Sequence, residues 1–264
     1  MTFLQQFIIA IVQGITEFLP ISSSGHLILI PKLTDWPDQG PLIDVAVHVG
    51  SLLAIILYFR KDVIGLARGG FATVGLGEDP EQRRLFLFVL AGTIPAVIAG
   101  LYLKLGGHLE SLRSTQLVAI NLIVFGILLG IADRIGKATK TYEDLSLRDA
   151  IIVGVAQAMA LIPGTSRSGA TMTAARFLGY DRVESARFSF LLAIPAVAGA
   201  GLIAALDLAE ATREMQLDAF GAGVMTFFAA LATMMFLMNF LKKASMMVFV
   251  VYRVILGTAL LLLF

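Results

Sequence analysis

Residues 13–26 read Gln13-Gly14-Ile15-Thr16-Glu17-Phe18-Leu19-Pro20-Ile21-Ser22-Ser23-Ser24-Gly25-His26, a polar stretch inside an otherwise apolar sequence. A related stretch reads Gln157-Ala158-Met159-Ala160-Leu161-Ile162-Pro163-Gly164-Thr165-Ser166-Arg167-Ser168-Gly169-Ala170-Thr171. With Gln13 aligned on Gln157, the two stretches match again at Ser22/Ser166, Ser24/Ser168 and Gly25/Gly169, and each has a proline a few residues before its serines. The chain therefore contains an internal repeat of a serine-rich turn.

Each serine-rich turn is predicted to interrupt a helix inside the membrane. Residues 2–19 have an apolar helical pattern that Pro20 ends, because proline disfavours helix at the residue before it and lacks a backbone donor. Ser22 to Gly25 then supply a turn and an N-cap for a helix from His26 to about Leu33. About eight residues give about 12 Å of helix, too short for a bilayer core of about 30 Å. The pair is therefore expected to be a re-entrant hairpin, with its turn buried in protein or facing a wet cavity. Residues 148–178 repeat the pattern, broken at Pro163-Gly164.

The composition of the chain indicates one all-α, polytopic membrane domain over residues 1–264. The sequence is 58% hydrophobic and 15% charged, with a mean hydropathy of +0.86, whereas soluble domains have about 25% charged residues. The net charge of +1 argues against a nucleic-acid partner. The absence of cysteine excludes disulfides, thiolate metal sites and a cysteine nucleophile. The apolar N-terminus has no Lys or Arg before it and is expected to be retained rather than cleaved.

Six further apolar segments are long enough to be membrane spans, and charge orients them. They cover residues 42–59, 85–103, 117–132, 185–206, 219–241 and 246–264. The connectors rich in Lys and Arg are expected in the cytoplasm; they carry Arg60, Lys61, Arg68, Arg83, Arg84, Arg134, Lys137, Lys140, Arg148, Arg176, Arg182, Arg187, Lys242 and Lys243. Tracing the chain through these assignments gives two inverted halves, about 1–135 and 148–264, each a re-entrant hairpin followed by three spans. Inverted repeats with broken helices place their working site where the breaks meet.

The two turns together carry the parts of a phosphate site. Helix N-termini offer unpaired N–H groups and the positive end of a dipole. Arg167 adds a permanent charge that can bind phosphate through two hydrogen bonds. Small residues in the turns let an oxyanion approach the backbone. The candidate diphosphate-binding residues are Gln13, Ser22, Ser24, Gly25, Thr165, Ser166, Ser168 and Gly169, with Arg167.

Glu17 and His26 indicate hydrolysis rather than binding alone. A carboxylate, an imidazole and several hydroxyls around a bound phosphate are the groups that phosphoryl transfer to water requires. A carboxylate repels a nearby phosphate unless a cation intervenes. Glu17 is therefore also a candidate ligand for a divalent metal, Mg²⁺ or Ca²⁺, because both prefer oxygen donors.

The motifs resemble a known bacterial family. Gln13-x-x-x-Glu17, Pro20-x-Ser22-Ser23-Ser24-Gly25-His26 and Pro163-Gly164-Thr165-Ser166-Arg167-Ser168-Gly169 are similar to the two signature motifs of the undecaprenyl pyrophosphate phosphatase family, also called the bacitracin-resistance family. The segment Asp44-Val45-Ala46-Val47-His48-Val49-Gly50-Ser51 resembles it too, so the resemblance covers essentially the whole chain.

The resemblance implies a membrane phosphatase of the bacterial cytoplasmic (inner) membrane, with its site open toward the periplasm. Its expected reaction converts undecaprenyl diphosphate to undecaprenyl phosphate and inorganic phosphate, which recycles the carrier for peptidoglycan synthesis and confers bacitracin resistance. It implies metal dependence as well. The expected partners are the polyprenyl diphosphate lipid and the membrane, with a homodimer as the candidate assembly.

The resemblance also assigns roles within the site. Glu17 takes the metal or base role, and Gln13, which cannot act as a base, takes a positioning role. Ser23 and His26 are both candidates for the covalent nucleophile, and the family pattern favours Ser23, with His26 as acid/base. Arg167 holds the diphosphate, assisted by Thr165, Ser166 and Ser168.

Structural and functional alternatives stay open at this point. The serines could be helix caps only, Glu17 an interhelical pairing residue, and Arg167 its neutralising partner. A lipid or anion transporter or flippase would use the same inverted architecture, and an anion-binding scaffold would use the same turns. His48 is expected to be an interface or loop-facing residue, and Arg253 to pair across helices or to extend toward the membrane surface.

Overall fold

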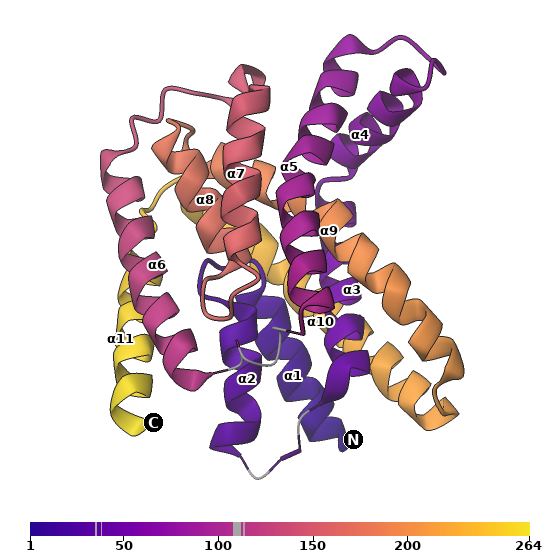
Figure 1. The fold of residues 1–264 in the computed structure, drawn as a ribbon, viewed down its shortest axis with the longest axis vertical. Coiled ribbons are helices and arrows are strands. Elements are labelled where there is room, and N and C mark those ends of the chain that lie inside the picture. The colour runs from indigo at the N-terminus through magenta and orange to yellow at the C-terminus, as the bar shows by residue number, and fades with distance from the viewer. Residues whose placement is uncertain (35, 38, 108–111, 113) are drawn as a thin grey trace.

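The computed structural model describes residues 1–34, 36–37, 39–107, 112 and 114–264, with the side chains of all of these except 200 and 203–210. Within them the chain forms eleven α-helices and a short 3-10 helix, η2 (Tyr142–Asp144), and no β-strand, which confirms the all-α prediction (Figure 1). The α-helices are α1 (Phe3–Thr16), α2 (Ser23–Leu33), α3 (Gly40–Tyr58), α4 (Arg60–Thr73), α5 (Pro80–Leu105), α6 (Thr115–Ile135), α7 (Leu147–Met159), α8 (Arg167–Phe177), α9 (Arg182–Glu210), α10 (Arg213–Leu241) and α11 (Met247–Leu263).

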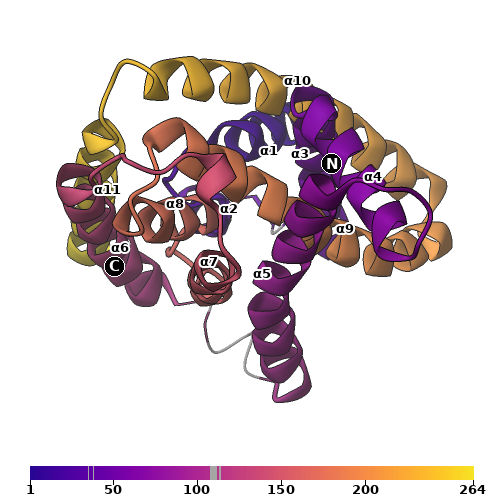
Figure 2. The ribbon, with the colours of Figure 1, turned by 90° about the horizontal axis from the view of Figure 1, so that it is seen from above.

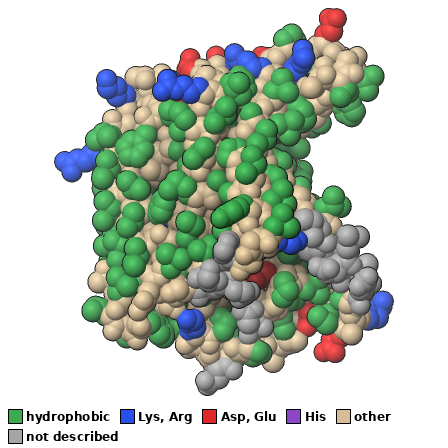
Figure 3. Space-filling model, viewed as in Figure 1, with side chains coloured by type: hydrophobic (Ala, Val, Ile, Leu, Met, Phe, Trp, Pro, Cys, Tyr) green, Lys and Arg blue, Asp and Glu red, His purple; other side chains and the backbone are tan. Residues whose placement is uncertain are grey.

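Long apolar helices make this a multi-pass membrane protein. In the described part of the chain, α3, α5, α6 and α10 are long and apolar enough to cross a bilayer, and α1 and α11 are shorter apolar helices. Large apolar side chains cover much of the surface around the middle of the molecule (Figure 3). Such a surface is stable in lipid but not in water. The predicted spans are confirmed as helices.

Two hairpins are interrupted at mid-height of the molecule, as the repeated turns predicted. Residues 17–22 separate α1 from α2, and residues 160–166 separate α7 from α8. The α1–α2 pair and the α7–α8 pair enter from opposite ends, and their turns meet in the middle (Figure 1). Seen from above, α2 and α8 lie centrally, with α6 and α11 on one side and α3 and α9 on the other, while α10 runs along one edge from the α11 side to the α9 side (Figure 2). The inverted correspondence of the remaining spans stays a prediction.

The two helix starts have the same unusual cap. Ser22 and Ser166 both have positive φ, 78° and 71°, and both precede the first helical residue. The hydroxyl of Ser22 accepts from Gly25 N, so α2 begins at Ser23, three residues before the predicted start at His26. Gly164, also at positive φ (87°), approaches the backbone of Val118 so closely that no Cβ would fit. These conformations turn the chain sharply between the two helices of each hairpin.

One end of the molecule carries the basic connectors. The α4–α5, α6–α7 and α10–α11 connections lie at the end opposite both termini (Figure 1), and Lys and Arg side chains gather there (Figure 3). The connector between the predicted spans 42–59 and 85–103 is not a loop throughout, because its residues 60–73 form α4. This helix packs on α5, where Gly69 allows contact with the backbone of Gln82.

Candidate active site

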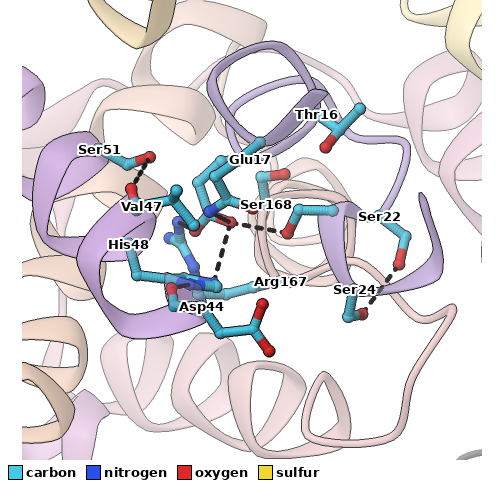
Figure 4. A network of polar contacts seen from close by, with 12 residues as sticks. Thr16, Glu17, Ser22, Ser24, Asp44, Val47, His48, Ser51, Arg167 and Ser168 are labelled. Atoms are coloured by element: carbon cyan, nitrogen blue, oxygen red, sulfur yellow. Dashed lines mark hydrogen bonds and ion pairs between the residues drawn. The ribbon is translucent and has the colours of Figure 1, made fainter. Parts of the chain in front are cut away.

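Glu17 is the residue at which the two turns meet. It follows the last residue of α1 and is 7% exposed. Its Oε1 accepts from Arg167 Nη2 at 2.8 Å (Figure 4). Its Oε2 accepts from Ser23 Oγ at 2.7 Å and from Gln13 Nε2 at 3.2 Å. An ionised carboxylate at membrane depth is costly unless it is paired. The structure therefore brings Glu17, Ser23 and Arg167 together with Gln13.

The helix ends fix these side chains in place. Ser23 is the first residue of α2, and Arg167 is the first residue of α8. Phe18, next to Glu17, is fully buried and packs edge-on against Phe190 of α9, with ring centroids 5.3 Å apart. Arg167 Nη1 also donates to Ser189 O at 3.3 Å. Glu17, Ser23 and Arg167 are therefore held by the ends of three different helices, α1, α2 and α8, which limits their motion.

The hydroxyls of the turns are used mainly for capping. Ser22 Oγ and Ser166 Oγ accept from Gly25 N (3.3 Å) and Gly169 N (3.1 Å), as capping serines do. Ser22 lies 3.3 Å from Ser24, and Ser166 lies 3.3 Å from Ser168, measured between hydroxyl oxygens. Ser168 Oγ also donates to Leu19 O at 3.1 Å and so links the second turn to the first. The capping interpretation is confirmed for Ser22 and Ser166, and the role of these serines in binding a diphosphate stays a prediction.

Two helix N-termini consequently point toward the same region. Both α2 and α8 are eleven residues long and begin at the centre of the molecule. Their first N–H groups and dipoles favour an anion there, and Arg167 lies beside them. Thr165 is fully buried, and its hydroxyl has no hydrogen-bond partner among the described residues. A diphosphate would find donors from both turns.

His26 hydrogen-bonds to Ser22 and Tyr252. Its Nδ1 donates to Ser22 O at 2.7 Å, so its Nε2 is the acceptor for Tyr252 OH at 2.6 Å, with the two rings stacked. In the described part of the chain it makes no hydrogen bond or ion pair with Glu17, Ser23 or Arg167. Its acid/base role stays a prediction.

His48 is the histidine that the structure places beside Glu17. Its Nδ1 donates to Asp44 O at 2.6 Å, and its Nε2 lies 3.7 Å from Glu17 Oε2 (Figure 4). His48 of α3 therefore faces the turn between α1 and α2, in agreement with the expectation of an interface or loop-facing residue. The spacing of Asp44 and His48, one helical turn apart within a family-like segment, was the available signal, but nothing local showed which face of α3 meets the turn.

The residues around Glu17 fit a divalent cation that also binds the substrate. No group of three His, Cys, Asp or Glu side chains gathers in the described residues. However, Mg²⁺ is commonly held by one or two protein oxygens together with phosphate oxygens. Glu17 supplies a carboxylate, and the adjacent Gln13 Oε1 is buried with no hydrogen-bond partner among those residues. These two oxygens would hold the cation on the protein side.

Comparison with known proteins gives a match over nearly the entire chain. The model of a family described as "Bacitracin resistance protein BacA" matches residues 6–259. A protein of Erythrobacter litoralis (strain HTCC2594) named undecaprenyl-diphosphatase is 63% identical over 285 residues, covering 100% of both chains. Proteins with the same name from Hahella chejuensis (strain KCTC 2396) and Idiomarina loihiensis (strain ATCC BAA-735 / DSM 15497 / L2-TR) are 48% and 47% identical, over 99% and 100% of this chain and 98% and 100% of theirs.

Proposed function

This chain belongs to the bacitracin resistance protein BacA family, and we propose that its paired turns hydrolyse the diphosphate of a polyprenyl lipid. The reaction is the conversion of undecaprenyl diphosphate to undecaprenyl phosphate and inorganic phosphate, which returns the lipid carrier to peptidoglycan synthesis. The observation that carries the site assignment is the Arg167–Glu17–Ser23 contact between two opposed helix starts. It supplies a cation, a proton acceptor and a nucleophile around one buried carboxylate.

Substrate binding is the first step that these residues explain. The lipid tail stays in the membrane while the diphosphate enters between the turns. There the N–H groups at the starts of α2 and α8 and the guanidinium of Arg167 bind the phosphate oxygens. The Arg167 side chain is 16% exposed, and its Nη1 and Nη2 donate to Ser189 O and to Glu17 Oε1.

In the proposed reaction Ser23 attacks the terminal phosphorus. Its Oγ–H points at Glu17 Oε2, 2.7 Å away, so the carboxylate can take the proton as the new O–P bond forms. The bond between the bridging oxygen and the terminal phosphorus then breaks, and undecaprenyl phosphate leaves. Water hydrolyses the phosphoserine, releasing inorganic phosphate and restoring the Ser23 hydroxyl. His26 is the other candidate nucleophile, and its partner Tyr252 would first have to move away.

A divalent cation, when bound, would neutralise charge on the phosphate oxygens and let a carboxylate stand beside them. Glu17 and Gln13 would hold it. Mg²⁺ or Ca²⁺ fits these oxygen donors.

The proposed location is the bacterial inner membrane, with the site opening toward the periplasm. The gathering of Lys and Arg at the end opposite both termini supports this orientation, because cytoplasmic connectors are enriched in these residues (Figure 3). A homodimer is a further proposal, and its test is the mass of the purified protein in detergent.

The assay for the proposed function is phosphate release from undecaprenyl diphosphate by the purified protein in detergent with Mg²⁺. Wild type should release phosphate, whereas Glu17→Ala and Arg167→Ala should lose at least about 100-fold in kcat/KM, since each removes a group that acts in the transition state. Full activity of either variant would refute the site. An anion transporter is the alternative, and it is disfavoured because an anion carrier has no use for Glu17 beside its cargo.

A further inference from the structure

Arg253 of α11 lies between the two turns. It is fully buried, and its guanidinium donates to five backbone carbonyls. Nη1 donates to Pro20 O of the first turn at 3.1 Å, and Nη2 donates to Gly164 O and Thr165 O of the second at 3.0 and 2.8 Å. The other two carbonyls belong to α6, Asn121 at 3.2 Å and Leu122 at 3.1 Å. One side chain thus ties both turns to the same framework.

The charge of Arg253 has no acidic partner in the part of the chain that the structure describes. Its contacts are carbonyl dipoles only, whereas Arg167 and Arg182 pair with carboxylates. A buried cation without a counter-ion is costly and is usually kept for function. Its position beside the turns adds positive potential to the region that receives the diphosphate.

Two glycines make room for this side chain. A Cβ at Gly126 of α6 would lie 3.0 Å from Arg253 Cβ, and a Cβ at Gly169 of α8 would lie 2.7 Å from Arg253 Nη1. Any other residue at these positions would press on the arginine. The local packing is therefore built around the guanidinium.

Two of the carbonyls that accept from Arg253, those of Pro20 and Thr165, lie one or two residues before the helix caps with positive φ. Pro20 lies two residues before Ser22, and Thr165 lies immediately before Ser166. A serine at positive φ persists only where its surroundings fix it, and the hydrogen bonds to Pro20 O and Thr165 O fix the chain on the entry side of each cap. The caps in turn set the direction of the first N–H groups of α2 and α8.

From this arrangement we propose that Arg253 is a positioning residue for phosphate hydrolysis, which sets the two anion-binding helix starts relative to Glu17 and Ser23 without touching the substrate. The inference rests on the proposed function. It predicts that a substitution that weakens the hydrogen bonds of Arg253 lowers kcat much more than it raises KM. A displacement of catalytic groups by about 1 Å lowers the rate about 100-fold.

The first test compares Arg253→Lys with Arg176→Lys. Arg176 is the control: it is also buried and donates to three backbone carbonyls, of Tyr180, Asp133 and Gly136, but it lies at the far end of α8. Within the described residues, and unlike Arg253, it also pairs with a carboxylate, that of Asp133, at 3.5 Å. Both variants are measured for phosphate release and for melting temperature in detergent. We expect kcat of Arg253→Lys to fall about 10- to 100-fold, and kcat of Arg176→Lys to stay within about 2-fold at a similarly lowered melting temperature. Wild-type kcat in Arg253→Lys would overturn the proposal.

A second pair of variants serves if Arg253→Lys does not fold. Gly126→Ala presses on Arg253, whereas Gly130→Ala, one turn along α6, meets Val250 Cγ1 of α11 at 3.2 Å instead. Both add one methyl group to the same interface, and only the first should lower kcat, by about 3- to 10-fold for a shift of a few tenths of an ångström. Equal kcat values in the two variants would overturn the proposal. Absence of phosphate release by wild type would instead refute the proposed function itself.

Discussion

Glu17 holds three donors on two oxygens, and each donor comes from a different place in the chain: Gln13 within α1, Ser23 across the first turn and Arg167 from the second hairpin. The Ser23 contact is the one that indicates hydrolysis, because a carboxylate that accepts the proton of a hydroxyl makes the hydroxyl oxygen a better nucleophile. The other two contacts keep the carboxylate oriented. The consequences of single substitutions around Glu17 therefore differ in kind.

Replacing the Ser23 hydroxyl should abolish covalent catalysis. We expect Ser23→Ala to reduce kcat at least about 1,000-fold while the protein still folds, because loss of a nucleophile leaves only binding and charge stabilisation. The measurement is phosphate release, together with trapping of a labelled phosphoenzyme from a substrate labelled in its terminal phosphate. Thr16→Val is the control, since the Thr16 hydroxyl donates to Val12 O in the preceding turn of α1. A phosphoenzyme that still forms in Ser23→Ala would transfer the nucleophile role to His26.

Removing divalent cations should suppress turnover. With excess chelator we expect phosphate release to fall at least about 10-fold and to return when Mg²⁺ or Ca²⁺ is added, because the carboxylate of Glu17 would otherwise repel the diphosphate. Titration of the metal into wild type and Glu17→Gln provides the check. Full activity in chelator would remove the metal from the mechanism and leave Glu17 as a base.

Both hairpins contain the same type of helix cap, a serine with positive φ. Ser22 and Ser166 cap their helices at positive φ, each bonding the N–H three residues on. Most capping residues have an extended backbone, as Ser146 does before α7 with φ −111°. The positive φ is what folds each short helix back toward its partner and directs its start to the centre.

Strain at these caps should appear in a comparison of alanine with glycine. At Ser146 and at Ser166 alanine removes the cap, at a cost of about 1–2 kcal/mol, and glycine costs less. At Ser166 glycine also relieves the left-handed backbone, so the gap between Ser166→Ala and Ser166→Gly should exceed the gap at Ser146 by about 1 kcal/mol. Thermal unfolding in detergent measures both pairs. Equal gaps would mean that the cap of α8 is not strained.

The two ends of the molecule differ in charge. The basic connectors share the end opposite both termini. There Asp133 of α6 binds Arg182 at 2.6 Å and accepts from Met246 N at 3.0 Å, which ties the helices together on that side. This end is expected in the cytoplasm by the positive-inside rule.

The orientation can be tested in a chain that has no cysteine of its own. In intact spheroplasts, a membrane-impermeant maleimide should label Glu214→Cys, at the start of α10, because that residue is exposed on the side of the termini. Lys137→Cys, exposed in the α6–α7 connector, should react only after permeabilisation. The reverse pattern would invert the proposed topology and place the site toward the cytoplasm.

The local sequence pattern alone determined the membrane helices and the positions at which two of them break. The lengths of the apolar runs specify membrane helices, and Pro20 and Pro163-Gly164 specify where two of them break, because these are properties of neighbouring residues and of the solvent around them. The repeat and the family-like motifs also predicted Glu17, Ser23 and Arg167 as candidate site residues. Glu17 and Arg167 stand out because ionised side chains at membrane depth are costly.

Tertiary structure alone decided which groups meet. His48 rather than His26 lies beside Glu17, and Arg253 reaches carbonyls 88 to 233 positions away in the chain. No sequence period encodes such contacts, because they depend on how α3 and α11 pack against the turns and on the space left at Gly126 and Gly169. The sequence specified the reactive groups and the breaks, whereas the packing of distant helices fixed their distances and orientations, on which hydrolysis depends.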